Sequence, residues 1–285
     1  MLDSLMTDGS MRHRRIVPMQ IGLNRIIAPS LPLYDFFSLA QRCGCSIIEL
    51  RNDLTNQHPF DTKNPEEVRD QLAKYHLKVA AINAFQRFNE YTDAKKEEFK
   101  SLLEYAKSLR ADAIVLCPVN GVEREADGAS WLERTTQSLS EYGPLFEEYG
   151  LYGYVEPLGF RASSLRTKAE AIKAIEASGY ERWYRLVHDT FHHHLANEKQ
   201  YFASMTNLVH LSSVASGPRH TEPTDADRIL FQEDDLLATA EQAQALVNSG
   251  YRGIFSFEPF SPAVQNLDID TLETEVKKSI NQLFR

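Results

Sequence analysis

The sequence has no long apolar run. No stretch approaches the roughly 18 consecutive apolar residues that suggest a membrane span. The first residues, MLDSLMTDGSMRHRR, also lack the apolar segment of a signal peptide. These two absences predict a cytoplasmic protein with no membrane partner. We interpret residues 1–15 as a disordered leader and expect residues 16–285 to form one catalytic domain, because no linker-like change of composition follows.

Cysteine and positive charge are scarce as well. The three cysteines are Cys43, Cys45 and Cys117. Their odd number and the tight CGC spacing favour free thiols in a reducing compartment over disulfides or a zinc knuckle. The 31 Lys and Arg residues are outnumbered by 40 Asp and Glu residues, which gives a formal net charge of −9. A negative surface repels phosphate backbones, so nucleic acid is disfavoured as a partner.

Familiar phosphate-binding, nucleophile and zinc-protease motifs are missing too. The chain has no Walker-type loop, no G-x-S-x-G and no H-E-x-x-H. The segment GLNRIIAPS after the first expected strand carries one glycine, where a dinucleotide-binding sheet would have a glycine-rich turn. An open doubly wound sheet is therefore the weaker of the two folds that the strand pattern allows.

Eight short apolar segments alternate with longer amphipathic ones. Helical patterns include 64–77, with Asn64 as cap and Pro65 after it, 167–179, with a Thr-x-x-Glu capping box, and 233–250. Eight strands, each followed by a helical segment, predict an α/β fold, a single (β/α)8 TIM barrel, whose usual length is about 250 residues. The expected strands are 17–24, 46–51, 78–85, 112–118, 152–158, 184–190, 207–213 and 253–259.

Ligand-type side chains stand at the last four expected strands. The fifth ends in Glu156, the sixth ends in Asp189, the seventh contains His210 and the eighth ends in Glu258. Chemistry in a TIM barrel takes place at these C-terminal ends, and a carboxylate there is costly to bury unless a cation binds it. Each residue alone is most often a solvated group or an ion-pair member. Together they predict one divalent metal ion, and Mn²⁺, Mg²⁺, Co²⁺ and Zn²⁺ all suit this donor set.

The segment HDTFHHHLANE (188–198) adds four histidines around Asp189. His192 lies three residues after Asp189, near enough to face the same cavity. Strand alternation points His188 to the opposite face, under the outer helices. His193 and His194 are interpreted as loop or helix-start residues.

Three further polar residues are candidates for substrate contacts. Arg51 ends the second expected strand, Asn83 lies near the end of the third, and Arg228 follows the seventh. For Arg51 and Asn83, a salt bridge and a turn hydrogen bond explain the residue equally well.

At these residues the sequence resembles the xylose isomerase-like barrel superfamily of sugar isomerases and epimerases. Within it, the motifs are most similar to those of the inosose (2-keto-myo-inositol) isomerases of inositol catabolism. The resemblance implies a metal held by Glu156, Asp189, His210 and Glu258, and a substrate contact from His192. It runs from about Ile21 to the C-terminus and is carried by IELR (48–51), INAFQRFN (82–89), VEPLGF (155–160), HDTFHHH (188–194), LVHLSS (208–213), TDADRI (224–229) and GIFSFEPFSP (253–262).

The resemblance also implies a reaction. A proton leaves a hydroxyl-bearing carbon and another returns to the neighbouring carbonyl carbon, through a cis-enediolate. A divalent ion that binds both oxygens would stabilise the negative charge, and we expect Glu156 and Glu258 to move the protons. The substrate is then a keto-inositol or a keto-sugar, and isomerisation and epimerisation both stay open.

Other functions fit less well. The main alternative is a metal-dependent dehydratase of a cyclic keto acid, of the dehydroshikimate type, which needs the same ligands. An abasic-site endonuclease needs additional histidines at the early strands, where Arg51 and Asn83 stand. A sugar-binding barrel without activity is disfavoured by the intact pair of glutamates. A homo-oligomer is compatible with the sequence.

Overall fold

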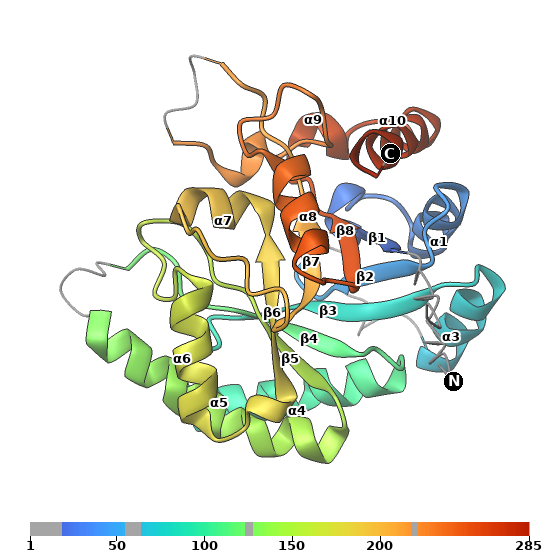
Figure 1. The fold of residues 1–285 in the computed structure, drawn as a ribbon. Helices are drawn as coiled ribbons and strands as arrows, with labels where there is room; N and C mark the ends of the chain where they lie inside the picture. Colours follow the sequence, from blue (N-terminus) through green and yellow to red (C-terminus); the bar gives the residue numbers. More distant parts are fainter. Residues whose placement is uncertain (1–18, 55–63, 123–127, 218–221, 285) are drawn as a thin grey trace, which may run out of the picture.

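The computed structural model describes residues 19–54, 64–122, 128–217 and 222–284. Eight parallel strands form a closed barrel in which each strand pairs with the next and β8 pairs with β1. The predicted single (β/α)8 barrel is confirmed (Figure 1). The predicted leader 1–15 lies outside the described residues. The strands are β1 (Gln20–Asn24), β2 (Ile47–Arg51), β3 (Lys78–Gln86), β4 (Ala113–Cys117), β5 (Tyr152–Val155), β6 (Tyr184–Asp189), β7 (Thr206–Leu211) and β8 (Ile254–Phe257).

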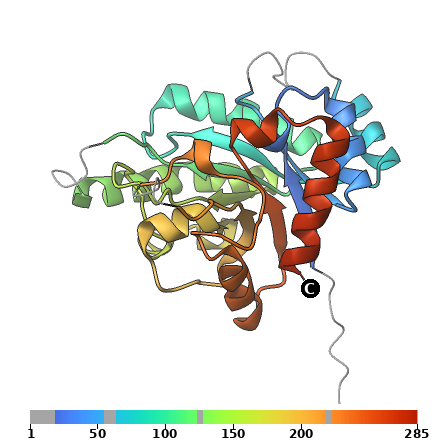
Figure 2. The same ribbon diagram turned by 90° about the horizontal axis from the view of Figure 1, so that it is seen from above.

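Helices surround this barrel. The last, α10, packs beside α1, where Arg42 Nη2 lies 2.6 Å from Asp270 Oδ1, and so closes the ring (Figure 2). No helix within the described ranges is long and apolar enough to cross a membrane. The helices are α1 (Leu33–Arg42), α3 (Pro65–Lys74), α4 (Asp93–Ser108), α5 (Gly128–Tyr149), α6 (Lys168–Ser178), α7 (Thr190–Ala196), α8 (Thr239–Asn248), α9 (Pro262–Gln265) and α10 (Ile269–Leu283).

The predicted caps are present. Asn64 accepts the N–H of Glu66 at the start of α3. Thr167 and Glu170 form the reciprocal capping box of α6. These local signals worked because each satisfies N–H groups that a helix start leaves free.

One expected helix, 233–250, was wrong at its beginning. The helix α8 starts only at Thr239. The carboxylate of Asp235 accepts the N–H groups of Val214, Leu237 and Thr239. These three hydrogen bonds stabilise a loop before Thr239. The acidic residue that the sequence pattern assigned to the helix start therefore lies in this loop.

The interior of the barrel has two layers that follow from strand alternation. The lower layer is an apolar cluster that includes Ile47, Ala81, Val115, Tyr154, Val187 and Leu208. Since alternate residues of a strand point to the same face, the residue two places further on each strand also points inward. Those residues are Glu49, Asn83, Cys117, Glu156, Asp189 and His210. The apolar floor therefore supports a polar layer at the C-terminal end of the barrel.

Candidate active site

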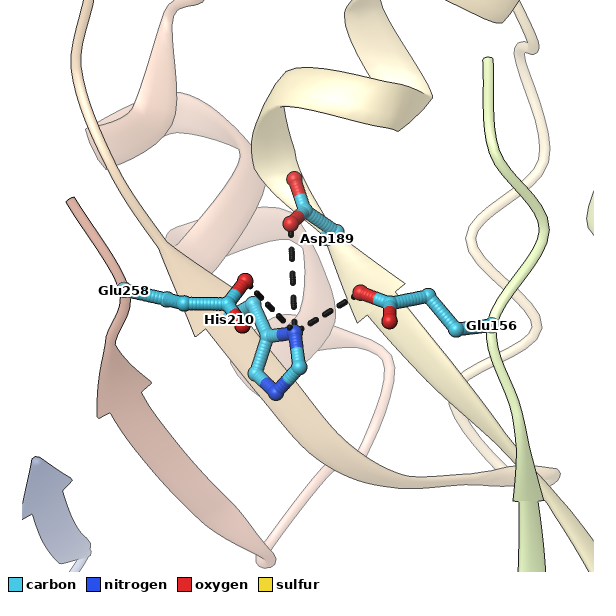
Figure 3. A group of neighbouring side chains, drawn as sticks. All are labelled: Glu156, Asp189, His210 and Glu258. Atoms are coloured by element: carbon cyan, nitrogen blue, oxygen red, sulfur yellow. Dashed lines mark hydrogen bonds and ion pairs between the residues drawn. The ribbon is translucent and has the colours of Figure 1, made fainter. Parts of the chain in front are cut away.

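The four predicted ligand residues converge at the centre of this polar layer. Suitable atoms of Glu156, Asp189, His210 and Glu258 all lie within 4.8 Å of one another, and all four residues are buried. Figure 3 shows the three carboxylates around Nδ1 of His210. That nitrogen lies 2.8 Å from Glu156 Oε1, 3.1 Å from Glu258 Oε2 and 3.8 Å from Asp189 Oδ2.

Asp189 is oriented by the helix that it begins. Its Oδ1 accepts the backbone N–H groups of Phe191 and His192 at the start of α7, at 2.7 and 3.1 Å. This N-cap arrangement is favourable because a helix start presents free N–H groups. The other oxygen, Oδ2, faces the centre of the cluster, where Arg228 Nη2 approaches to 2.6 Å.

Negative charge exceeds positive charge around these residues. Arg228 pairs with Asp189 and Glu258, but it also pairs with Asp225. Arg51 contacts Glu258 at 3.2 Å and holds Asp53 through two hydrogen bonds. Two arginines thus compensate the charge of several carboxylates in a buried site. This excess of negative charge favours the binding of an additional cation.

The pKa values reflect the same excess. Burial by itself lowers the pKa of His210, but the charges of Glu258, Glu49 and Glu156 outweigh it and raise that pKa well above its usual range. Burial by itself raises the pKa of Glu258, whereas His210, Arg228 and Arg51 outweigh it and lower that pKa. The cluster therefore attracts positive charge to the position of the imidazole.

A cavity of about 360 Å³ opens beside the cluster. Glu156 and Glu258 line it, whereas Asp189 and His210 are not among its lining residues in the described parts of the chain. All four predicted substrate contacts also line the cavity: Arg51, Asn83, His192 and Arg228.

These four residues differ in how far their polar atoms are already engaged. Arg51 and Arg228 are bound to carboxylates, so the salt bridge that the sequence allowed for Arg51 is present. Asn83 donates to Glu49 Oε2 at 3.2 Å. His192 differs, because its buried Nδ1 has no hydrogen-bond partner within the described residues. Its ring meets Phe160 edge to face, with 5.1 Å between centroids.

Sequence reasoning missed three residues that support the cluster. Glu49 Oε2 lies 3.0 Å from Nε2 of His210. Asn24, at the end of β1, donates to Glu258 Oε1 at 3.0 Å, and the thiol of Cys117 donates to Glu156 Oε2 at 3.3 Å. Strand alternation could have identified Glu49, because it is two residues before Arg51 and shares its face.

His188 and His193 belong to a separate buried cluster outside the barrel. The ammonium group of Lys168 on α6 lies 3.0 Å from His188 Nδ1 and 2.7 Å from His193 Nδ1. His188 Nε2 lies 2.9 Å from Gln242 Oε1 on α8. The prediction that His188 packs under the outer helices is confirmed, and His193 and His194 lie in α7.

The three cysteines are free, as predicted. Cys43 and Cys45 are buried in the core cluster. Cys117 alone of the three lines the cavity among the residues described. Burial in the core or beside the cavity accounts for the position of each cysteine.

Comparison with known proteins shows which family shares this architecture. The family model of the xylose isomerase-like TIM barrel matches residues 37–284. A xylose isomerase domain containing protein from Salmonella typhimurium LT2 is 35% identical, with a TM-score of 0.85 over 94% of this chain and 98% of that one. No curated protein matches the chain. The resemblance to this superfamily is confirmed.

Two other solved structures share the fold at lower identity. An IOLI protein with a bound zinc atom is 21% identical, with a TM-score of 0.83 over 93% of this chain and 98% of that one. D-psicose 3-epimerase from Clostridium cellulolyticum H10, solved with D-tagatose, is 15% identical, with a TM-score of 0.70 over 93% and 98%.

Proposed function

The chain belongs to the xylose isomerase-like TIM barrel family, and from this membership and the geometry of its site we propose that it is a metal-dependent isomerase or epimerase of a keto-inositol or keto-sugar. One observation carries the proposal. Four ligand-type side chains converge, and two of them, Glu156 and Glu258, also line a cavity. A carboxylate that reaches both a metal and a substrate can do acid–base work beside a polarised carbonyl.

The metal is the first part of the proposal. Glu156, Asp189, His210 and Glu258 would hold one divalent ion, with Mn²⁺, Mg²⁺, Co²⁺ or Zn²⁺ suited to three oxygen donors and one nitrogen. The buried excess of carboxylates fits such an ion, and the bound zinc of the similar IOLI protein supports it. When bound, the ion would act as a Lewis acid for charge that develops on substrate oxygens.

The proton carriers are the second part. Glu258 has both oxygens engaged: Asn24 and Arg51 contact Oε1, and Arg228 contacts Oε2. Glu156 Oε2 has the weak thiol donor of Cys117 as its contact. We therefore assign the first proton abstraction, from the carbon beside the carbonyl, to Glu156 Oε2. The resulting enediolate then takes up a proton. Isomerisation follows if the proton is added to the neighbouring carbon, and epimerisation follows if it is added to the opposite face of the same carbon. Glu258 takes part in this second transfer.

The lining of the cavity favours an uncharged substrate. Each arginine that lines it is already paired: Arg51 with Asp53, Arg228 with Asp189, and Arg87 with Glu90. A keto acid would bring a further carboxylate next to Glu156 and Glu258, which is unfavourable without an unpaired cation. This disfavours the dehydratase alternative. The unpartnered Nδ1 of His192 suits a neutral hydroxyl or carbonyl group.

The test is isotopic. Metal-loaded protein is incubated in D₂O with inososes, ketohexoses and dehydroshikimate, and the C–H signals beside the carbonyl are followed by NMR. Glu156→Gln should slow exchange by about 10² to 10⁴, since it keeps a metal-binding oxygen but loses the base. Glu258→Gln should let exchange continue but block product formation.

A matched control is Glu141→Gln, on α5, where Glu141 pairs with Lys96 of α4. It should exchange like the wild type. Exchange at the wild-type rate in both Glu156→Gln and Glu258→Gln would rule out this pair as proton carriers. If wild-type protein exchanges no proton with any of these inososes or ketohexoses, the isomerase proposal fails.

A further inference from the structure

Glu49 reaches across the inside of the barrel to His210. It lies on β2, whereas His210 lies on β7, and β8 and β1 stand between these strands. Glu49 is fully buried. Its Oε2 lies 3.0 Å from Nε2 of His210. The other three carboxylates lie around the second ring nitrogen, Nδ1 (Figure 3).

We propose that Glu49 is a positioning residue that fixes the tautomer and orientation of His210. A neutral imidazole carries one N–H, and the other nitrogen is an acceptor. In the metal-loaded site, the carboxylate of Glu49 would hold that proton on Nε2 and leave the lone pair of Nδ1 for the ion among Glu156, Asp189 and Glu258. A carboxylate behind a histidine ligand commonly sets its orientation and raises its basicity. The inference rests on the metal centre of the proposed function.

The surroundings of Glu49 do not explain it as a stabilising residue. In the described part of the chain its side chain has polar contacts with His210 and Asn83. In the metal-loaded site, where His210 would be a neutral ligand, neither contact of Glu49 would be a cation. Its second oxygen, Oε1, has no hydrogen-bond partner among the residues described. A buried carboxylate with so little compensation is costly. Ile47, two residues earlier on the same face, shows that an apolar side chain is accommodated inside this barrel.

The experiment measures zinc affinity rather than activity. Metal-stripped wild type, Glu49→Gln and Glu49→Leu are titrated with Zn²⁺ against a chromophoric chelator. Glu49→Leu should bind Zn²⁺ about 10- to 100-fold more weakly, the usual effect of losing such an outer partner. Glu49→Gln keeps an acceptor without the charge and should lie between Glu49→Leu and the wild type.

Ser256→Ala is the matched control. Ser256 is buried and adjacent to His210 in the register of β7 and β8, and its hydroxyl has no partner within the described ranges. Its removal should leave zinc affinity unchanged. Long-range ¹H–¹⁵N NMR of the zinc-loaded wild type adds a direct readout, in which His210 should carry its proton on Nε2 and bind zinc through Nδ1.

Each result decides a separate point. Wild-type zinc affinity in folded Glu49→Gln and Glu49→Leu would overturn the role of Glu49 and leave the metal centre standing. Zinc on Nε2 of His210 would do the same. A wild type that takes up no divalent ion would overturn the metal centre and the role of Glu49 with it. If Glu49→Leu does not fold, the near-isosteric Glu49→Gln decides.

Discussion

The buried cluster of His188, Lys168 and His193 predicts a specific sensitivity to acid. The ammonium group of Lys168 is a donor only, so the imidazole nitrogens that it contacts act as acceptors. Burial, and then the charge of Lys168, lower the pKa of His193 to about 3. His193→Gln keeps an acceptor oxygen for Lys168 but removes the titrating group, so this substitution isolates its contribution.

The magnitude follows from linkage. The pKa of His193 rises to about 6.5 when the chain unfolds. Between these values the unfolded chain binds a proton that the folded chain does not, so the free energy of unfolding falls as the pH falls. At about 1.36 kcal/mol per pH unit the full effect is about 5 kcal/mol, of which about 2 kcal/mol falls between pH 7 and pH 5.

Urea unfolding followed by circular dichroism at pH 7 and pH 5, with chelator present, measures this difference. Wild type should lose about 2 kcal/mol more than His193→Gln across that interval. His194→Gln, at a half-buried histidine of the same helix, is the control and should follow the wild type more closely. Equal losses in wild type and His193→Gln would refute the reasoning. The helix concerned, α7, has Asp189 as its N-cap and carries His192, so acid should also disturb the candidate active site.

The remaining predictions concern the metal and the substrate. Asp189→Ala and His210→Ala should lose the divalent ion while circular dichroism shows a retained fold, and full occupancy by elemental analysis in both would contradict the ligand assignment. Chelation of wild-type protein should lower its free energy of unfolding by about 2.7 kcal/mol relative to protein with metal at 100 times the dissociation constant; an unchanged melting temperature would argue against a resident ion. His192→Ala should keep the metal but reduce turnover, whereas His194→Ala should leave both unchanged; equal losses of turnover in the two variants would mean that α7 is merely structural.

Much of the fold could be read from the sequence because its signals are local. Apolar runs gave all eight strands, and the capping residues of α3 and α6 gave two helix starts. The strand ends were less exact. The fifth strand ends at Val155, earlier than expected, because Pro157 has no N–H to donate to a neighbouring strand. The false start of α8 came from Asp235, whose partner Val214 is distant in sequence.

The sequence could identify the site residues only where the pattern along a single strand is sufficient. Glu156, Asp189, His210 and Glu258 each follow an apolar run, and that pattern is visible without any tertiary structure. The partner of each is not visible, because it depends on which strands face one another across a closed barrel. Arg51 illustrates this: the sequence allowed a substrate contact or a salt bridge, and the structure places Asp53 and Glu258 around its guanidinium group.

The two halves of the barrel thus contribute different groups to the candidate site. The last four strands and their ends present the candidate ligands, and the first four present several of the groups that contact them. Asp189 is instead held by the start of α7 and by Arg228. The groups from the first four strands are an amide, a carboxylate, a guanidinium and a thiol, so they share no chemical type that would mark them as one set. Glu49, Arg51 and Cys117 each lie two residues beyond an inward-facing residue of the same strand. The pairs are Asn24 and Arg51 with Glu258, Glu49 with His210, and Cys117 with Glu156.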